Sequence, residues 1–169
     1  MSIKNKVNFK KGWPSPTIVE AVANVASGNT ALQAGMIGHL NSSGEWVLGM
    51  VINAATPVPE AYATPYIFHN DYLDGDTGNY SADTTISNPA KYGGVHGISL
   101  QQPLVIETSQ IASDFDPAVG TRLMSTGGTL IAAATQYNRV IGYVTEGRHT
   151  YNGLTYITFA PELGTVFMP

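Results

Sequence analysis

Short apolar runs that alternate with turn signals are the feature that most limits what this chain can fold into. The apolar run 36–40 is followed by Asn41-Ser42-Ser43-Gly44 and then by the run 46–52, which predicts a hairpin with a four-residue loop. A similar unit returns at 122–134 around the predicted turn Ser125-Thr126-Gly127-Gly128. Few segments keep the period of an amphipathic helix. The pattern predicts an all-β fold, a small β-barrel or sandwich with long loops and an extended N-terminal arm.

The remaining strands are predicted from the same signals. At 17–26 apolar and polar residues partly alternate, and the flanking Pro16 and Ser27-Gly28-Asn29 favour a strand over a helix. In the last third of the chain, strands are predicted at 140–146, 151–160 and 165–168, with Asn152-Gly153 as a turn.

The chain divides into an arm and a single domain. Residues 1–16 form the predicted arm, because Pro14-Ser15-Pro16 forbids a helix through this point. Residues 17–169 form a β-rich domain whose size allows one ordinary core. Its middle segment, 56–102, is interpreted as a loop-rich insertion that crosses the end of the barrel. Such a long segment with many aromatic residues is expected to pack on the body or on a neighbouring chain.

Composition excludes several classes of protein. Charged residues are 12% of the chain, about half the usual quarter, while 43% are hydrophobic, which argues against a charged coiled coil or a disordered chain. Cysteine is absent, so a disulfide scaffold, a thiolate zinc site and a cysteine nucleophile are excluded.

The basic residues are distributed unevenly. Four of the eight lie in the first eleven positions, so the arm carries +4 and the rest of the chain −8 with histidine neutral. We interpret the arm as a docking strand that adds to a partner's sheet edge. A solubilising tail is the alternative, and nucleic acid is disfavoured because the acidic body would repel a polyanion. The predicted docking residues are Ile3, Lys4, Lys6, Val7, Phe9, Lys10, Lys11 and Trp13.

The sequence contains no catalytic or cofactor motif. The four histidines are scattered, and no nucleophile elbow, dinucleotide fingerprint or P-loop is present, so we predict neither an enzyme nor a cofactor. An enzyme would need His69 or His96 to meet Asp71 or Glu107. The metal candidate is a calcium loop, although its spacing does not match an EF-hand and a solvated acidic loop is favoured. Its carboxylates are Asp71, Asp74, Asp76 and Asp83.

Several segments between residues 17 and 160 resemble tailed-phage capsid decoration (cement) proteins and related virion structural proteins. In the first half the similar segments are Val19-Glu20-Ala21-Val22-Ala23, Leu32-Gln33-Ala34-Gly35-Met36-Ile37 and Asn41-Ser42-Ser43-Gly44-Glu45-Trp46-Val47-Leu48. In the second half they are Ile106-Glu107-Thr108, Asp114-Phe115-Asp116, Val119-Gly120-Thr121-Arg122-Leu123, Gly127-Gly128-Thr129-Leu130 and Val140-Ile141-Gly142-Tyr143-Val144.

The resemblance implies a non-enzymatic β-domain, often a homotrimer, that sits on a phage capsid and clamps neighbouring capsomers. In the phage lambda type, an N-terminal arm orders on the capsid and pairs with capsid strands, and residues 1–16 occupy the corresponding place. The expected partner is the major capsid protein, and the expected location is the capsid surface of the virion after synthesis in the host cytoplasm. No membrane contact is expected, because the most apolar stretch, 46–55, is about half the length that spans a bilayer.

A second hypothesis is a tail or baseplate adaptor, or a receptor- or glycan-binding module of a virion. Under this hypothesis aromatic residues of the long loops would form a contact surface, and the candidates are Tyr62, Tyr66, Tyr72 and Tyr80. Burial of these aromatics at a subunit interface is the favoured interpretation.

Overall fold

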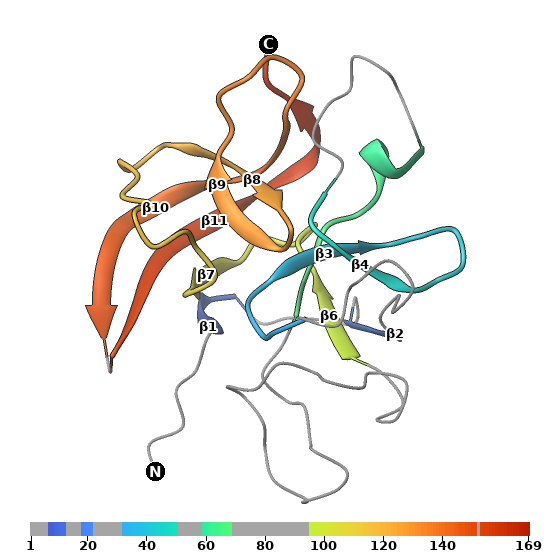
Figure 1. Ribbon diagram of the computed structural model, residues 1–169, viewed down its shortest axis with the longest axis horizontal. Coiled ribbons are helices and arrows are strands. Elements are labelled where there is room, and N and C mark those ends of the chain that lie inside the picture. Colours follow the sequence, from blue (N-terminus) through green and yellow to red (C-terminus); the bar gives the residue numbers. More distant parts are fainter. Residues whose placement is uncertain (1–6, 13–17, 22–31, 51–58, 69–94, 152) are drawn as a thin grey trace, which may run out of the picture.

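The computed structural model describes residues 7–12, 18–21, 32–50, 59–68, 95–151 and 153–169, and within them the fold is all-β (Figure 1). The prediction of an all-β fold is therefore confirmed. The elements are β1 (Val7–Lys11), β2 (Ile18–Ala21), β3 (Ile37–Leu40), β4 (Trp46–Leu48), the 3-10 helix η3 (Pro59–Tyr62), β5 (Tyr66–Phe68), β6 (Val95–Ser99), β7 (Val105–Thr108), β8 (Arg122–Thr126), β9 (Thr129–Ala132), β10 (Arg139–Tyr151) and β11 (Leu154–Phe167).

The strands form two open antiparallel sheets. The six-stranded sheet has the order β1-β7-β11-β10-β8-β9, and the five-stranded sheet has the order β2-β6-β5-β3-β4. Neighbouring strands are antiparallel in both sheets. Because each sheet keeps two edge strands among the described residues, the barrel alternative is wrong, and the sandwich-like alternative describes the fold.

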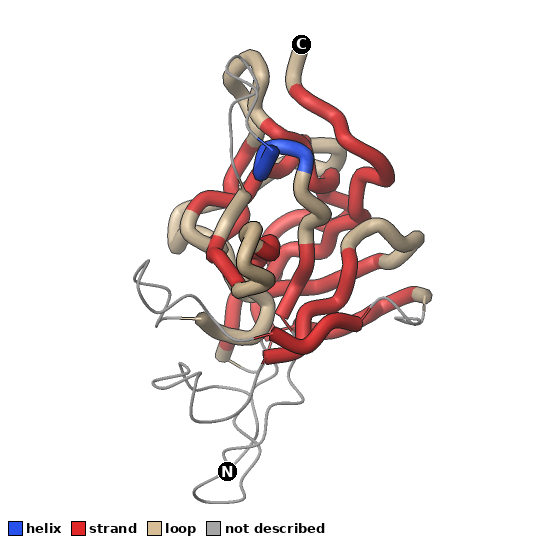
Figure 2. Tube along the Cα trace, turned by 90° about the vertical axis from the view of Figure 1, so that its right-hand side faces the viewer, coloured by secondary structure: helices blue, strands red, loops and turns tan. Residues whose placement is uncertain are grey.

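The main core lies between the two sheets. Ile37 and Ile67 reach it from the five-stranded sheet, and Ile106, Ile157 and Phe159 reach it from the six-stranded sheet, all with 0% exposure. Side chains alternate across a strand, so the neighbours of these residues point to the opposite faces. We call the face of the six-stranded sheet that points away from this core the outer face. Figure 2 shows η3 toward the end of the molecule at which the C-terminus lies.

A second apolar cluster covers the other face of the five-stranded sheet. Leu32, Trp46 and Phe68 are its buried members, and Tyr66 packs against them. The five-stranded sheet therefore carries apolar side chains on both faces, which explains why its strands show little polar alternation in the sequence.

Both predicted short hairpins form, and one of them has a tighter turn than expected. In the β3–β4 hairpin, the Asn41 side-chain oxygen accepts the backbone N–H groups of Ser43 and Glu45, both at 2.9 Å. In the β8–β9 hairpin the prediction of a four-residue turn from Ser125 is wrong. Thr126 pairs with Thr129, so the loop is Gly127-Gly128 alone. Its φ values of +57° and +92° suit a two-residue type I′ turn.

The middle segment is more regular than the sequence predicted. Its described parts contain η3 and the strands β5 and β6, which are interior strands of the five-stranded sheet. This part of the segment 56–102 is thus integral to a sheet and does not cross the end of a barrel. Residues 69–94 lie outside the described part of the chain.

One long hairpin replaces the predicted separate strands at the end of the chain. β10 and β11 pair along most of their length, from Arg139↔Phe167 to Tyr151↔Leu154, across the expected turn. The register shifts between Val140 and Gly142 and twice more toward the tip. Such bulges insert unpaired residues and bend a strand, and they interrupt the alternation on which a strand prediction depends.

The N-terminal arm is only partly separate from the domain. Val7–Lys11 forms β1, which pairs with β7 at the edge of the six-stranded sheet, and Val7 is 2% exposed in the core. The prediction of a separate arm over residues 1–16 is therefore wrong for this stretch, because burial of Val7 and Phe9 stabilises β1 on the chain's own sheet. Four predicted docking residues lie outside the described residues, namely Ile3, Lys4, Lys6 and Trp13.

Candidate functional site

A buried carboxylate with three polar partners lies on the outer face of the six-stranded sheet. Glu107 of β7 accepts hydrogen bonds from Asn8 Nδ2 at 2.7 Å and from His149 Nε2 at 2.8 Å. Its Oε1 also lies 3.1 Å from Lys10 Nζ. The Glu107 side chain is 5% exposed, against 49% for Lys10 and 27% for His149. We call these four residues the Glu107 cluster.

Strand register brings the Glu107 cluster together. Asn8 of β1 and Thr158 of β11 lie directly opposite Glu107 on its two sides, and Glu146 of β10 lies opposite Thr158. This row of outward-facing polar residues crosses four strands that come from three distant parts of the sequence. His149 enters from β10, with its ring stacked on Tyr156 at a centroid distance of 6.0 Å. The cluster therefore links the edge strand β1 to the β10–β11 hairpin.

The charges in the cluster stabilise one another. Burial alone would raise the pKa of Glu107, but hydrogen bonds from His149, Asn8 and Lys10, with the charge of Lys10, hold this pKa below its ordinary value. Burial alone would lower the pKa of His149, but its bonds to the Gly147 carbonyl and Glu107, with the charges of Glu146 and Glu107, raise it.

The arrangement of His149 favours a structural role over acid–base catalysis. Nδ1 lies 2.9 Å from the Gly147 carbonyl oxygen, and Nε2 lies 2.8 Å from Glu107 Oε1. Both neighbours are acceptors, which favours N–H donors on both ring nitrogens and so the imidazolium form, in keeping with the raised pKa. Neither nitrogen is left free to take a proton from a substrate. Sequence analysis missed this pair, because 42 residues separate the partners and no local motif marks them.

The Glu107 cluster predicts a maximum of stability at mildly acidic pH. The lowered pKa of Glu107 contributes stability above its ordinary value of 4.5, and this contribution is lost as the pH falls through the lowered pKa. The raised pKa of His149 contributes stability below its ordinary value of 6.5, and this is lost as the pH rises through the raised pKa. We therefore expect the free energy of unfolding to be greatest between about pH 4.5 and pH 6.5.

Denaturant unfolding at a series of pH values measures this profile. In Glu107→Gln the loss at acid pH should shrink, and the loss at alkaline pH should shrink too because His149 has lost a charged partner. In His149→Gln the alkaline loss should disappear, and the acid loss should shrink because Glu107 has lost a donor that lowers its pKa. A wild-type profile that both variants reproduce would contradict the assignment.

A bulge in β1 directs two consecutive lysines to the outer face. The pairing of β1 with β7 shifts between Phe9 and Lys11, which pair with Ile106 and Val105. Consecutive residues of a strand normally point to opposite faces. Here the bulge turns one of the two lysines, so that Lys10 and Lys11 point to the same face. Lys10 reaches Glu107, while the exposed Lys11 borders a hollow farther along the same face. Gly12 ends the strand with a φ of +81°, and a Cβ there would lie 2.7 Å from the Pro103 carbonyl oxygen.

The hollow beside Lys11 has a volume of about 490 Å³ and an apolar floor. We call it the outer hollow. Two large apolar side chains on its border are exposed, Tyr143 at 42% and Leu163 at 53%. It is lined by Lys11, Pro103, Leu104, Val105, Tyr143, Ala160, Pro161, Glu162 and Leu163.

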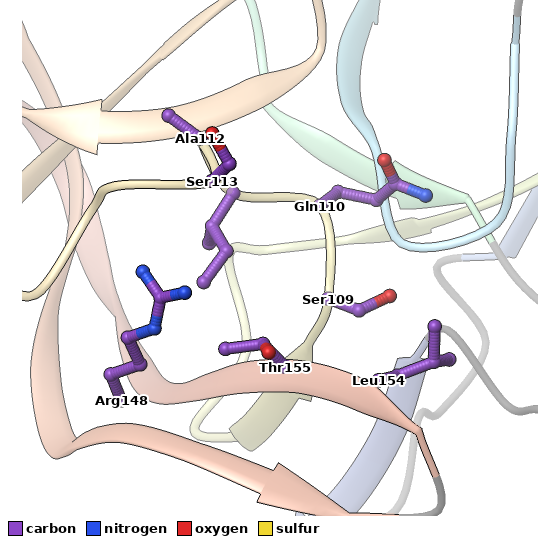
Figure 3. A pocket seen from close by; sticks show the side chains of 8 residues that line it. Ser109, Gln110, Ala112, Ser113, Arg148, Leu154 and Thr155 are labelled. Atoms are coloured by element: carbon purple, nitrogen blue, oxygen red, sulfur yellow. The ribbon is translucent and has the colours of Figure 1, made fainter.

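A smaller pocket of about 330 Å³ lies between the β10–β11 hairpin and the segment that follows β7 (Figure 3). In Figure 3, Arg148 lies across the pocket from Ser109 and Leu154. Arg148 Nη1 donates to the Phe115 carbonyl oxygen at 3.3 Å. We interpret this contact as one that holds the segment against the hairpin.

The remaining candidate residues from the sequence do not assemble into a site among the described residues. Tyr66 packs against Trp46 in the second apolar cluster, whereas Tyr62 contacts Phe167. His96 lies in β6 of the five-stranded sheet, whereas Glu107 and its partners lie in the six-stranded sheet. In the described part of the chain, no group of three acidic or histidine side chains could hold a metal ion. Seven candidates lie outside it, namely His69, Tyr72, Tyr80 and the four acidic residues of the calcium loop, Asp71, Asp74, Asp76 and Asp83.

No protein-family model matches this chain, and a search of curated proteins finds no relative. Among the described residues, no helix has the length and apolar character needed to cross a bilayer.

Proposed function

We propose that this protein is a virion structural protein that binds and stabilises an assembled phage capsid, as a decoration or cement protein does. It acts without catalysis, as a homotrimer on the capsid surface, and its partner is the major capsid protein. The observation that carries the proposal is the lysine-bearing edge strand. Lys11 is exposed beside the apolar outer hollow, and Lys4 and Lys6 precede this strand in the sequence.

The energetics of attachment support a combination of charge and apolar contact. An exposed ion pair contributes only about 0.2–1 kcal/mol, so lysines alone do not hold a protein on a surface. A stable contact buries about 800 Å² on each partner, much of it apolar. The outer hollow offers apolar area next to Lys11, and three subunits acting together multiply the effect of one arm. A protein that binds only the assembled lattice stabilises that lattice by mass action.

The structure decides which truncation can test this proposal. Deleting residues 1–14 would remove β1 together with the buried Val7, so the fold would not stay intact. Deleting residues 1–6 leaves β1 whole and removes Lys4 and Lys6. The expected result is binding at least about tenfold weaker than that of the full chain, because each trimer loses six charges. The measurement is co-sedimentation with shells assembled from the major capsid protein of the same genome.

The matched control is the full chain with Lys4→Arg and Lys6→Arg, which keeps the charge and should bind like the wild type. Raising the salt concentration should weaken wild-type binding and reduce the difference between wild type and truncation. A wild-type protein that stays in the supernatant while the shells sediment would contradict the proposal. Label at the tail tip of purified virions would favour an adaptor or receptor-binding protein instead.

A further inference from the structure

A row of side chains crosses five strands of the six-stranded sheet, and four of its members line the outer hollow. Lys11 of β1 is opposite Val105 of β7, and Tyr143 of β10 is opposite both Ala160 of β11 and Arg122 of β8. Ala160 follows Phe159, which pairs with Ile106, so it lies beside Val105. Val105, Ala160 and the large Tyr143 thus form the middle of the row, and a basic residue lies at each end.

The two terminal cations have no acidic partner in the described part of the chain. Lys11 is exposed, and the nearest polar contact of Arg122 is the Met168 sulfur at 3.8 Å from Nη1. Glu162 is the one acidic residue that lines the hollow. It lines the same hollow as Lys11, but among the described residues no ion pair joins the two, so both ends of the row stay cationic.

The apolar rim of the hollow is held in place. Gln101 accepts the backbone N–H of Gly164 at 2.6 Å and donates to the Glu162 carbonyl oxygen at 3.3 Å. These two bonds flank Leu163, which stands where β11 bulges between its pairings at Pro161 and Val166. Gly164 has a φ of +92°, a conformation that glycine adopts without strain. These bonds restrict the backbone on both sides of Leu163, so less backbone freedom is lost when its side chain is covered.

We propose that the outer hollow receives an extended segment of the capsid partner, with apolar side chains in its middle and a carboxylate at each end. This inference rests on the proposed function and names the chemistry of its contact. Apolar side chains would cover Val105 and Ala160 between Tyr143 and Leu163, and the carboxylates would pair with Lys11 and Arg122.

The strand spacing sets the length of the segment. Four steps of about 4.8 Å between strands separate the positions of Lys11 and Arg122, or roughly 19 Å. An extended chain rises about 3.3 Å per residue, and every second side chain points to the same face. A segment of about seven residues therefore places its first, third, fifth and last side chains against the sheet.

A heptapeptide probe tests the inference with the isolated protein. The probe has glutamate at the first and last positions, valine at the third and fifth, and serine elsewhere, and its counterpart has lysine at both ends. NMR titration should show binding of the glutamate peptide, with shifts at Val105, Tyr143 and Ala160, and at least tenfold weaker binding of the lysine peptide. Equal binding of both peptides, or shifts elsewhere, would overturn the inference.

The protein variants use the same titration and the shell assay. Lys11→Glu and Leu163→Ser should each weaken peptide and shell binding about tenfold, a loss of about 1.4 kcal/mol. Tyr151→Ser is the matched control, because Tyr151 is 70% exposed at the tip of the hairpin and should bind normally. Thermal unfolding establishes that every variant is folded.

The two proposals fail in different ways. If wild type and both hollow variants sediment equally with shells, the hollow is not the contact, while capsid binding itself stands. If the wild type ignores shells, the proposed function fails, and the peptide titration alone decides whether the hollow binds an acidic–apolar–acidic segment.

Discussion

Trp46→Ala is expected to lower the free energy of unfolding by about 3–5 kcal/mol, the usual cost of removing a large buried aromatic side chain. Trp46 is 0% exposed and lies at the centre of the apolar cluster on the five-stranded sheet. Its ring meets Tyr66 edge-on at a centroid distance of 5.0 Å and Phe68 at 5.2 Å. Both contacts add to the apolar burial and are lost together. Denaturant unfolding measures the effect.

Gly97 provides an independent check on the role of Trp46. A Cβ at Gly97 would lie 2.5 Å from the far edge of the indole ring, so Gly97→Ala is expected to destabilise the wild type. In a Trp46→Leu background the smaller side chain relieves this clash, and the cost of Gly97→Ala should fall. Costs that simply add would show that the two residues are not coupled. Tyr151→Ala, a change to an exposed aromatic residue, should leave stability within about 0.5 kcal/mol of wild type.

Arg139→Ala is expected to cost about 1–3 kcal/mol, because it leaves the buried carbonyl of Ala61 and the part-buried carbonyl of Ala63 without their donor. Arg139 begins β10 and is 2% exposed. Its Nη1 donates to the carbonyl oxygens of Ala61 at 2.6 Å and Ala63 at 3.2 Å, at the C-terminal end of η3. Burial lowers the pKa of this guanidinium, and among the described residues no carboxylate offsets its charge. The side chain joins the segment before β5 to the six-stranded sheet.

Hydrogen exchange separates this local contact from a general loss of stability. The N–H of Ala63, which donates to the Glu60 carbonyl oxygen at 3.1 Å, should lose protection in Arg139→Ala earlier than amides of β10 do. Arg139→Lys keeps the charge but not the planar group with several donors, and should fall between wild type and alanine. Arg148→Ala is the matched control, because Arg148 is exposed and its loss should cost less than about 1 kcal/mol. An equal cost for both arginines would contradict the assigned role.

Local turn chemistry accounts for what could be predicted about the fold. Asn41 and the glycines at 127 and 128 act within a few residues of themselves, so their hairpins could be placed from the sequence. The bulges of the long hairpin could not, because they depend on pairing with a strand elsewhere in the chain. For the same reason β1 was expected to be an arm. The residues of Val7–Lys11 do not by themselves indicate that this strand will pair with β7, almost a hundred residues away, and bury its apolar side chains there.

By itself, the sequence determined the all-β class, the two short hairpins and the concentration of lysines near the N-terminus, since propensity, turn chemistry and charge are properties of nearby residues. Only the tertiary structure decided that the sheets stay open, that Glu107 meets Lys10 and His149, and that an apolar hollow lies between Lys11 and Tyr143. These features arise from the pairing of distant strands, where a shift of one residue in register would turn each side chain to the other face.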